Sequence, residues 1–194
     1  MGEKAERTRE KIRREAYQLF ADKGFKEVTM TDVCEKTGLS RGGLYRHYSG
    51  TDAIFAEILS EEYVIDDRIE KCESAKTILE DMLENIQCEI MDEERSLSLA
   101  IYEYASLGNE DFFAKLNERA KKRWISLINY GIETREFKKV NPEQIAELIL
   151  YYYQGLRMWS RVIHFDDQTA EYYAETIRQQ LLNSKYGKDD GVNA

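Results

Sequence analysis

The chain has 194 residues, with 28 Lys and Arg against 37 Asp and Glu, and a formal net charge of −9. This length fits one large or two small domains with a substantial core, and the 42% of hydrophobic residues exclude a disordered chain. The longest apolar run, Leu148–Tyr153, is too short to cross a membrane, and the charged N-terminus lacks the apolar region of a secretory signal. Together with three scattered cysteines, these features predict a cytoplasmic protein with reduced thiols.

The total charge argues against a nucleic-acid partner, but the charge is unevenly distributed. Residues 1–50 hold 11 Lys and Arg against 8 Asp and Glu, a balance of +3. Residues 51–194 hold 17 against 29, a balance of −12. Such asymmetry between segments is a better guide to partners than the total. The basic first segment is therefore a candidate for nucleic-acid binding, provided that a motif supports it.

The first helix is predicted at about residues 5–23, where apolar residues from Ile12 to Phe20 recur at helical spacing. Gly24 is predicted as its left-handed C-cap, and Phe25 is placed to pack back on the end of the helix. A single proline in the whole chain also favours helices.

Two short helices follow, at residues 30–36 and 41–48. Thr29 and Asp32 form a shortened capping box for the first of them, and Ser40 is the predicted N-cap of the second. Two helices joined by such a short, glycine-containing turn are typical of a helix-turn-helix. The spacing alone leaves an ordinary helical hairpin equally open.

The remainder of the chain is also predicted to be helical. Further helices are expected near residues 51–70, 74–91, 94–107, 110–134, 142–163 and 168–184, and no alternating pattern of useful length predicts a strand. The predicted fold class is therefore all-α.

The run from Thr29 to Phe55 resembles the TetR family of bacterial transcriptional repressors, most specifically in Gly-Leu-Ser-x-Gly-x-Leu-Tyr-x-His-Tyr at residues 38–48. The resemblance covers roughly the first 60 residues. It implies about nine helices and a homodimer that a small molecule releases from operator DNA. The implied domains are a helix-turn-helix domain at residues 1–50 with a connecting helix at 51–70, and a helical ligand-binding and dimerisation domain at 71–194.

The predicted DNA contacts lie on the 41–48 helix, which would enter the major groove, and on its flanks. Arg41 suits either a base edge or a phosphate. Gly42 and Gly43 each weaken a helix by ~0.5–1 kcal/mol, which favours a functional reason such as close approach to the sugar-phosphate backbone. The predicted set is Thr29, Thr31, Ser40, Arg41, Gly42, Gly43, Tyr45, Arg46, His47, Tyr48 and Thr51; the resemblance makes Tyr45, His47 and Tyr48 phosphate contacts.

Thr51 departs from the family pattern, because many members carry a Lys there that holds a backbone phosphate. A threonine lacks the ionic part of that contact. We therefore expect a salt dependence of DNA binding that is shallower by ~1 unit per lost charge contact. Lys4, Arg7 or Arg9 would have to supply the missing charge.

The penultimate predicted helix is apolar on nearly all sides and must be covered on two of them. With the apolar stripe of the last helix it predicts a four-helix interface between two subunits; the alternative is a monomeric core helix. The predicted interface residues are Ile149, Tyr152, Leu156, Ile163, Tyr173, Ile177 and Leu181.

A pocket for a small hydrophobic or aromatic effector is predicted where the family encloses its ligand. Its predicted residues are Tyr102, Glu103, Trp124, Ile128, Tyr152 and Trp159, with plain core packing as the alternative for each aromatic. Glu103 lies in an apolar run, where it meets a cationic ligand, pairs with an arginine such as Arg157, or points to solvent.

An enzyme is the main reading from another class, and the sequence does not favour it. His47 and His164 are far apart, and no phosphate loop, zinc spacing or nucleophile elbow occurs. We expect no cofactor and no metal. The remaining alternative is a DNA-binding regulator that needs no effector, or that senses a protein or thiol oxidation.

Overall fold

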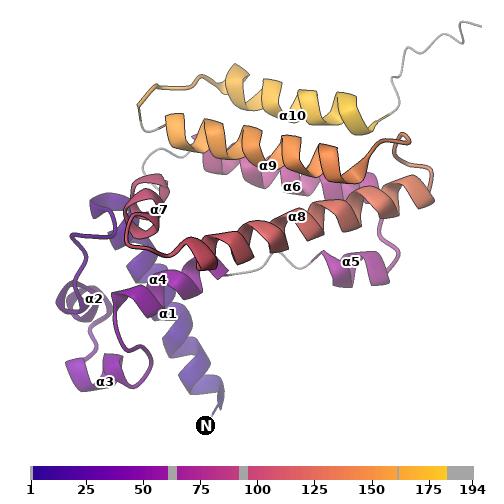
Figure 1. Cartoon of the computed structure of the whole chain (residues 1–194). Coiled ribbons are helices and arrows are strands. Elements are labelled where there is room, and N and C mark those ends of the chain that lie inside the picture. Colours follow the sequence, from indigo (N-terminus) through magenta and orange to yellow (C-terminus); the bar gives the residue numbers. More distant parts are fainter. Residues whose placement is uncertain (1, 61–64, 92–95, 161, 183–194) are drawn as a thin grey trace, which may run out of the picture. The chain divides into compact units, whose positions relative to one another are not determined.

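The computed structural model describes residues 2–60, 65–91, 96–160 and 162–182, and helices make up most of them (Figure 1). No strand occurs within these ranges. The all-α prediction is confirmed. Among these residues, no helix is both long and apolar enough to cross a membrane.

Ten helices occur in the described ranges, each close to a predicted segment. In chain order they are α1 (Gly2–Lys23), α2 (Met30–Thr37), α3 (Arg41–Tyr45), α4 (Thr51–Ser60), α5 (Asp66–Glu70), α6 (Ala75–Met91), α7 (Ser98–Ala105), α8 (Glu110–Glu133), α9 (Pro142–Trp159) and α10 (Asp167–Leu181).

The boundaries differ from prediction in several helices, most clearly in the 51–70 segment and at the end of α9. The single helix expected at residues 51–70 is two helices, α4 and α5, and residues 61–64 between them lie outside the described ranges. The second begins with two aspartates in its first turn, which a helix N-terminus favours. Helix α9 ends at Trp159, before the predicted residue 163, and the N–H groups of Val162 and Ile163 both donate to the carbonyl of Trp159, at 2.8 Å each.

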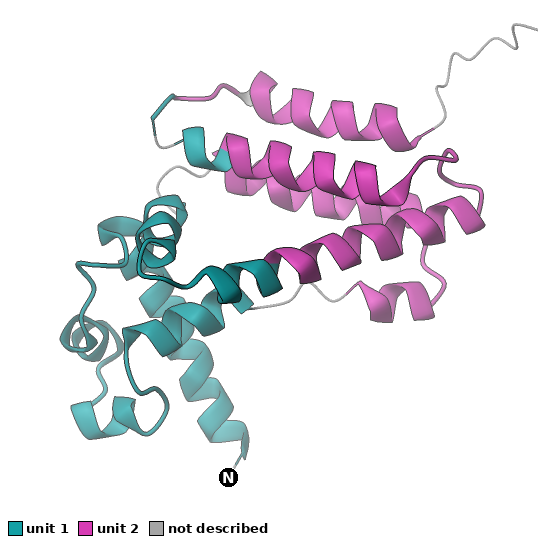
Figure 2. Ribbon diagram, in the orientation of Figure 1, with its two compact units in different colours: residues 1–63, 92–116, 157–163 teal, residues 64–91, 117–156, 164–194 magenta. Residues whose placement is uncertain are grey.

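The chain forms two compact units (Figure 2). Unit 1 comprises residues 1–63, 92–116 and 157–163, and unit 2 comprises residues 64–91, 117–156 and 164–194. Helix α7 and the first residues of α8, which the sequence assigned to the C-terminal domain, thus pack with the helix-turn-helix segment.

An aromatic cluster forms the core of unit 1. The ring of Phe20 on α1 lies 4.7 Å from Phe55 on α4 and 5.8 Å from Phe25, which confirms that Phe25 packs back on the end of α1. Tyr104 on α7 joins the cluster at 4.8 Å from Phe25 and 5.2 Å from Phe55. Gly24 takes a φ of +81°, as predicted for a left-handed C-cap.

The predicted capping box at the start of α2 is confirmed. The N–H of Asp32 donates to Thr29 Oγ1 at 3.2 Å, and the N–H of Thr29 donates to Asp32 Oδ2 at 2.9 Å. Lys23 of α1 adds an ion pair to the same carboxylate at 2.8 Å. Hydrogen bonds from Lys23 and Thr29 hold the pKa of Asp32 well below its usual value of 3.8.

This lowered pKa predicts the direction in which pH changes stability. The charged carboxylate favours the folded state, so its stabilisation is complete above the unfolded pKa and disappears as the pH falls through the folded pKa. We expect Asp32→Asn to lower the free energy of unfolding by about 0.5–1 kcal/mol at neutral pH. Below about pH 4 the difference from the unsubstituted protein should shrink.

Urea unfolding at several pH values measures this difference. Glu35→Gln, an exposed change on the same helix, is the matched control and should be near neutral throughout. A deficit of Asp32→Asn that stays constant from pH 7 to about pH 2 would contradict the assignment.

Unit 2 packs α6, α8, α9 and α10 around a core that has Tyr173 near its centre. The side chain of Tyr173 is fully buried, its hydroxyl donates to the carbonyl of Ile149 at 3.3 Å, and its ring lies 5.0 Å from Tyr152. Asn141 caps α9 through a 3.1 Å hydrogen bond from the N–H of Gln144 to its side-chain oxygen.

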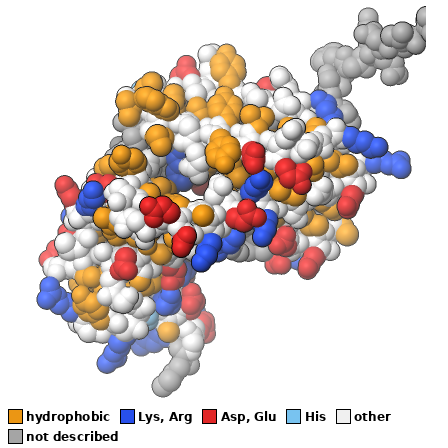
Figure 3. Space-filling view, in the orientation of Figure 1, with side chains coloured by type: hydrophobic (Ala, Val, Ile, Leu, Met, Phe, Trp, Pro, Cys, Tyr) orange, Lys and Arg blue, Asp and Glu red, His pale blue; other side chains and the backbone are white. Residues whose placement is uncertain are grey.

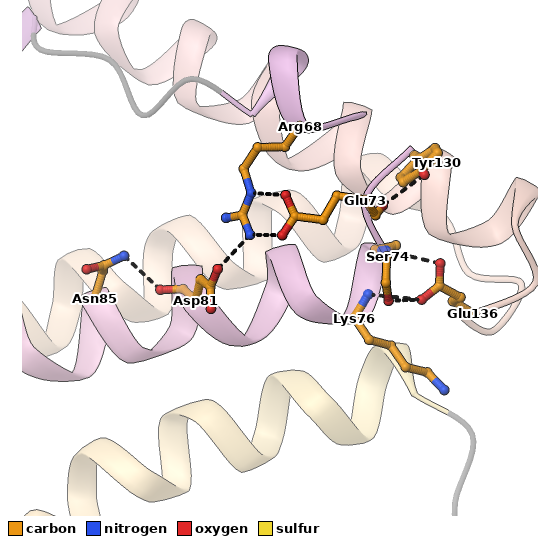
Figure 4. Close-up of polar contacts among 9 residues, drawn as sticks. Arg68, Glu73, Ser74, Lys76, Asp81, Asn85, Tyr130 and Glu136 are labelled. Carbon is orange, nitrogen blue, oxygen red and sulfur yellow. Dashed lines mark hydrogen bonds and ion pairs between the residues drawn. The ribbon is translucent and has the colours of Figure 1, made fainter. Parts of the chain in front are cut away.

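A polar network links the start of α6 to residues distant in sequence (Figure 4). The carboxylate of Glu136 accepts the N–H groups of Ala75 and Lys76 at 3.0 and 3.2 Å, and also the hydroxyl of Ser74. Arg68 binds Glu73 and, at 2.6 Å, Asp81. Glu136 thus supplies the N-terminal cap of α6 from the loop between α8 and α9.

Candidate DNA-binding surface

Helices α2 and α3 are joined by a tight turn of defined geometry. Gly38 has a φ of +70°, and its N–H donates to the carbonyl of Cys34 at 2.8 Å. Val33 and Leu44 are fully buried between the helices. Lys11 of α1 donates to the carbonyl of Thr37 at 2.8 Å, which ties the turn to the first helix. These contacts form a three-helix helix-turn-helix.

Helix α3 presents its outer face to solvent. Its N-cap is Ser40, as predicted, and the Ser40 hydroxyl accepts the N–H of Gly43 at 3.1 Å. Arg41, Gly42 and Arg46 are exposed, and Tyr45 is 53% exposed. A Cβ at Gly42 would meet nothing within 4 Å. The packing of the chain itself therefore does not require a glycine at this position.

Arg41 is held by a residue of α2. One of its guanidinium nitrogens donates to Thr31 Oγ1 at 2.9 Å. Both side chains are exposed and both belong to the predicted DNA-contacting set. Figure 3 shows Lys and Arg side chains around this end of unit 1, near α2 and α3.

Tyr48, a predicted phosphate contact, is buried in unit 1. It is only 4% exposed, and its hydroxyl donates to Glu57 Oε1 of α4 at 2.9 Å. Burial and the Glu57 carboxylate raise the pKa of Tyr48 to about 12. The side chain of Tyr48 thus belongs to the core of unit 1, and its contact with DNA stays a prediction. His47, beside it, is half-buried.

The other residues predicted to contact DNA differ in their exposure and in their hydrogen-bond partners. The hydroxyls of Thr29 and Ser40 serve as helix caps. Thr51 is half-buried in the first turn of α4. Of the cations proposed to replace the missing lysine, Arg7 pairs with Glu3 at 2.7 Å and Arg9 pairs with Glu57. Their DNA contacts stay predictions.

Sequence reasoning missed Glu57, which contacts three side chains of unit 1. Burial raises its pKa, but hydrogen bonds from Arg13, Tyr48 and Arg9 outweigh burial and hold the pKa below its usual value. The only signal in the sequence is an acidic residue inside the apolar run of α4.

The residues predicted for an effector pocket are divided between the two units. In unit 1, Tyr102 is 68% exposed and Trp159 is exposed. In unit 2, Trp124 and Ile128 are buried in the core, and Tyr152 is half-buried. The structure thus does not gather all six into one cluster within either unit.

Glu103 is half-buried and makes a contact that the sequence did not predict. Its Oε2 accepts the backbone N–H of Lys26, in the segment after α1, at 2.9 Å. A Cβ at Gly24 would lie only 2.7 Å from the same oxygen. Glu103 therefore ties α7 to the segment that leads into the helix-turn-helix.

The predicted dimer residues are mostly core residues of unit 2. Ile149, Tyr173, Ile177 and Leu181 have no exposed surface in the single chain, and their assignment to an interface stays a prediction. Tyr152 and Leu156 are half-buried, and Ile163 is exposed. The large exposed apolar side chains of α9 and α10 in unit 2 are Leu148, Tyr151 and Tyr172.

The sequence of this chain is similar to those of known transcriptional regulators. Residues 12–58 match the family model for bacterial regulatory proteins of the tetR family. YfiR, an uncharacterised helix-turn-helix-type transcriptional regulator of Bacillus subtilis, is 28% identical over 172 residues, 80% of each chain. KstR2, a transcriptional repressor of Mycolicibacterium smegmatis, is 22% identical over 188 residues, 90% of this chain and 86% of its own.

Similarity also extends to solved structures. A transcriptional regulator from Saccharomonospora viridis, solved in complex with choline, superposes with a TM-score of 0.67 at 16% identity, over 92% of this chain and 100% of its own. The helix-turn-helix with its exposed α3 defines the class, a DNA-binding transcriptional regulator. Within that class, the match of residues 12–58 and the similarity to these regulators support a regulator of the TetR family.

Proposed function

We propose that this protein is a homodimeric repressor that reads operator DNA with α3 and leaves it when a small hydrophobic or aromatic effector binds. The observation that carries the DNA-reading part is the position of Arg41 on the exposed face of a helix-turn-helix. Arginine there can donate two hydrogen bonds to a guanine edge in the major groove. The packing of the chain does not account for a glycine at position 42. A glycine there allows the DNA backbone to approach α3 closely, which supports the proposal.

The repressor part rests on relatives, since KstR2 is named a transcriptional repressor. The effector part rests on the choline complex of the similar fold and on the aromatic residues that α8 and α9 contribute to unit 2. A ligand acts only through a difference in its affinity for the DNA-competent and released forms. Release therefore requires an effector that disfavours the DNA-competent form.

In vitro selection from random duplexes with the full-length protein tests this function. We expect an enriched sequence with two related half-sites, bound at least 1,000-fold more tightly than a scrambled duplex of equal length, as is typical of specific binding. Failure to enrich any sequence at low salt would refute the DNA-reading role. Small aromatic and cationic compounds can then be screened for release of the enriched duplex.

The proposed homodimer can be tested by substituting an exposed apolar residue of α9. Tyr151 is 63% exposed in the single chain, so Tyr151→Lys costs little in folding but would disrupt an interface there. We expect the unsubstituted protein to sediment as two chains and Tyr151→Lys to sediment at the single-chain mass of 22.8 kDa. Leu107→Lys, an equally drastic change at an exposed site in unit 1, should stay dimeric.

A sedimentation mass near 22.8 kDa for the unsubstituted protein at micromolar concentration would contradict the dimer. A dimer that survives Tyr151→Lys would place the interface elsewhere on the chain.

A further inference from the structure

The carboxylate of Glu57 in unit 1 binds side chains from α1 and from residues 46–48. These three residues directly follow α3 and form the end of the α3 segment. Glu57 Oε1 accepts hydrogen bonds from Arg13 and from the hydroxyl of Tyr48, both at 2.9 Å. Its Oε2 pairs with Arg9. The Glu57 side chain is 27% exposed, and those of Arg13 and Tyr48 are less exposed, so water screens these contacts only in part.

Arg9 also contacts the residues that follow α3. Its second terminal nitrogen donates to the carbonyl of His47 at 3.3 Å, and its guanidinium carbon lies 4.7 Å from the centre of the Tyr48 ring. The N–H groups of His47 and Tyr48 both donate to the carbonyl of Leu44 inside α3. The end of the α3 segment is therefore held through Arg9 and Tyr48, and both are bound by Glu57.

The same contacts determine which charges are available to DNA. Arg9 lies beside His47, whose side chain is a predicted phosphate contact, and its own side chain is 34% exposed. A guanidinium paired with a carboxylate releases fewer counterions on binding a phosphate than an unpaired one. Because Arg9 is paired with Glu57, its charge is less available to a DNA phosphate.

We propose that Glu57 is a positioning residue that sets the specificity of DNA binding: it fixes the end of the α3 segment through Tyr48 and Arg9, and it withholds Arg9 from phosphate. The inference rests on the proposed reading of DNA by α3. It makes an uncommon prediction, because loss of the Glu57 charge should weaken specific binding and strengthen non-specific binding in the same variant.

Glu57→Gln tests this prediction. Glutamine keeps the size, the helix propensity and one acceptor oxygen, but it removes the charge. We expect about tenfold weaker binding to the enriched duplex, about threefold tighter binding to a scrambled duplex, and a non-specific salt slope steeper by about 0.9, the value for one additional phosphate contact. Glu10→Gln is the control, because it removes the same charge from an exposed position on α1. It should change neither affinity by more than about twofold.

Substitution of Arg9 separates the two roles of Glu57. In the single variant Arg9→Gln the non-specific salt slope should equal that of the unsubstituted protein, because Arg9 is not available to phosphate. In Glu57→Gln with Arg9→Gln, the gain in non-specific affinity and the steeper slope should both disappear. Arg9→Gln alone leaves Glu57 paired with Arg13 and Tyr48, so it remains informative if Glu57→Gln fails to fold.

Three results would overturn the proposal. Equal weakening of both affinities by Glu57→Gln would show a merely structural role. Behaviour like that of Glu10→Gln would show no role. A slope that falls by about 0.9 in Arg9→Gln alone would show that Arg9 already binds phosphate. If the unsubstituted protein enriched no sequence, the proposed function would fail, while the salt slopes on random duplexes would still test the Arg9 part separately.

Discussion

Replacing Arg41 with alanine is expected to weaken binding to the operator by about 10- to 100-fold, the loss of 1–3 kcal/mol that follows removal of a bidentate contact to a guanine. Binding to a scrambled duplex should weaken far less, because only one general electrostatic contact disappears. The exposed position of Arg41 and its 2.9 Å hydrogen bond to Thr31 carry this expectation, since an ordered guanidinium loses less conformational entropy on binding a base.

Competition binding with operator and scrambled duplexes at one salt concentration measures both losses. Arg41→Lys keeps the charge but not the planar pair of donors, so it should retain non-specific affinity and still lose most of the specificity. Equal losses on both duplexes in Arg41→Ala would instead identify Arg41 as a phosphate clamp. That result would leave base reading to other residues of α3.

Replacing Tyr104 with alanine is expected to destabilise unit 1 by about 3–5 kcal/mol, the usual cost of removing a large buried aromatic side chain. The ring lies within 6 Å of Phe25, Phe55 and Phe112, and only 7% of the residue is exposed. Tyr104 lies 46 residues beyond the end of the segment that matches the family model at residue 58. Its loss should nevertheless loosen α1 and α4.

Amide hydrogen exchange, read separately for each helix, measures this effect. Protection in α1 and α4 should fall in Tyr104→Ala, whereas Tyr104→Phe, which keeps the ring, should stay close to the unsubstituted protein. Faster exchange confined to α7 would contradict the view that α7 belongs to the core of the DNA-binding unit.

Local features were predictable from the sequence because a few neighbouring residues determine them. The capping box of Thr29 and Asp32, the N-cap Ser40 and the left-handed Gly24 depend on backbone and side-chain groups within three or four positions. The start of α9 after Asn141 is of the same kind. The helix-turn-helix followed from these signals together with the motif at residues 38–48.

Contacts between distant residues were not predictable, because one sequence does not reveal which elements pack together. Glu57 meets Arg9 and Arg13, 48 and 44 positions away, and Glu103 meets the backbone of Lys26, 77 positions away. Neither pairing leaves a trace in periodicity or composition. The partners of Tyr48 and Glu103 therefore emerge only from the fold.

The apolar faces of the last two helices show a further limit of periodicity. A stripe such as Tyr173, Ile177 and Leu181 indicates burial, but it does not tell whether the covering surface belongs to the same chain or to a partner. In the structure these side chains are buried within unit 2. The proposed dimer is therefore best tested at Leu148, Tyr151 and Tyr172, the exposed apolar residues of α9 and α10 in unit 2.

The most direct test of the central claim, that two copies of α3 read one operator, is the dependence of affinity on half-site spacing. A two-fold dimer places its recognition helices about one DNA turn apart, so inserting about five base pairs between the half-sites turns one of them to the opposite face of the duplex. A control duplex carries substitutions of the same central bases without a change in length. We predict that the insertion lowers affinity to the non-specific level while the control keeps most of it; equal affinity for the two duplexes would contradict the claim.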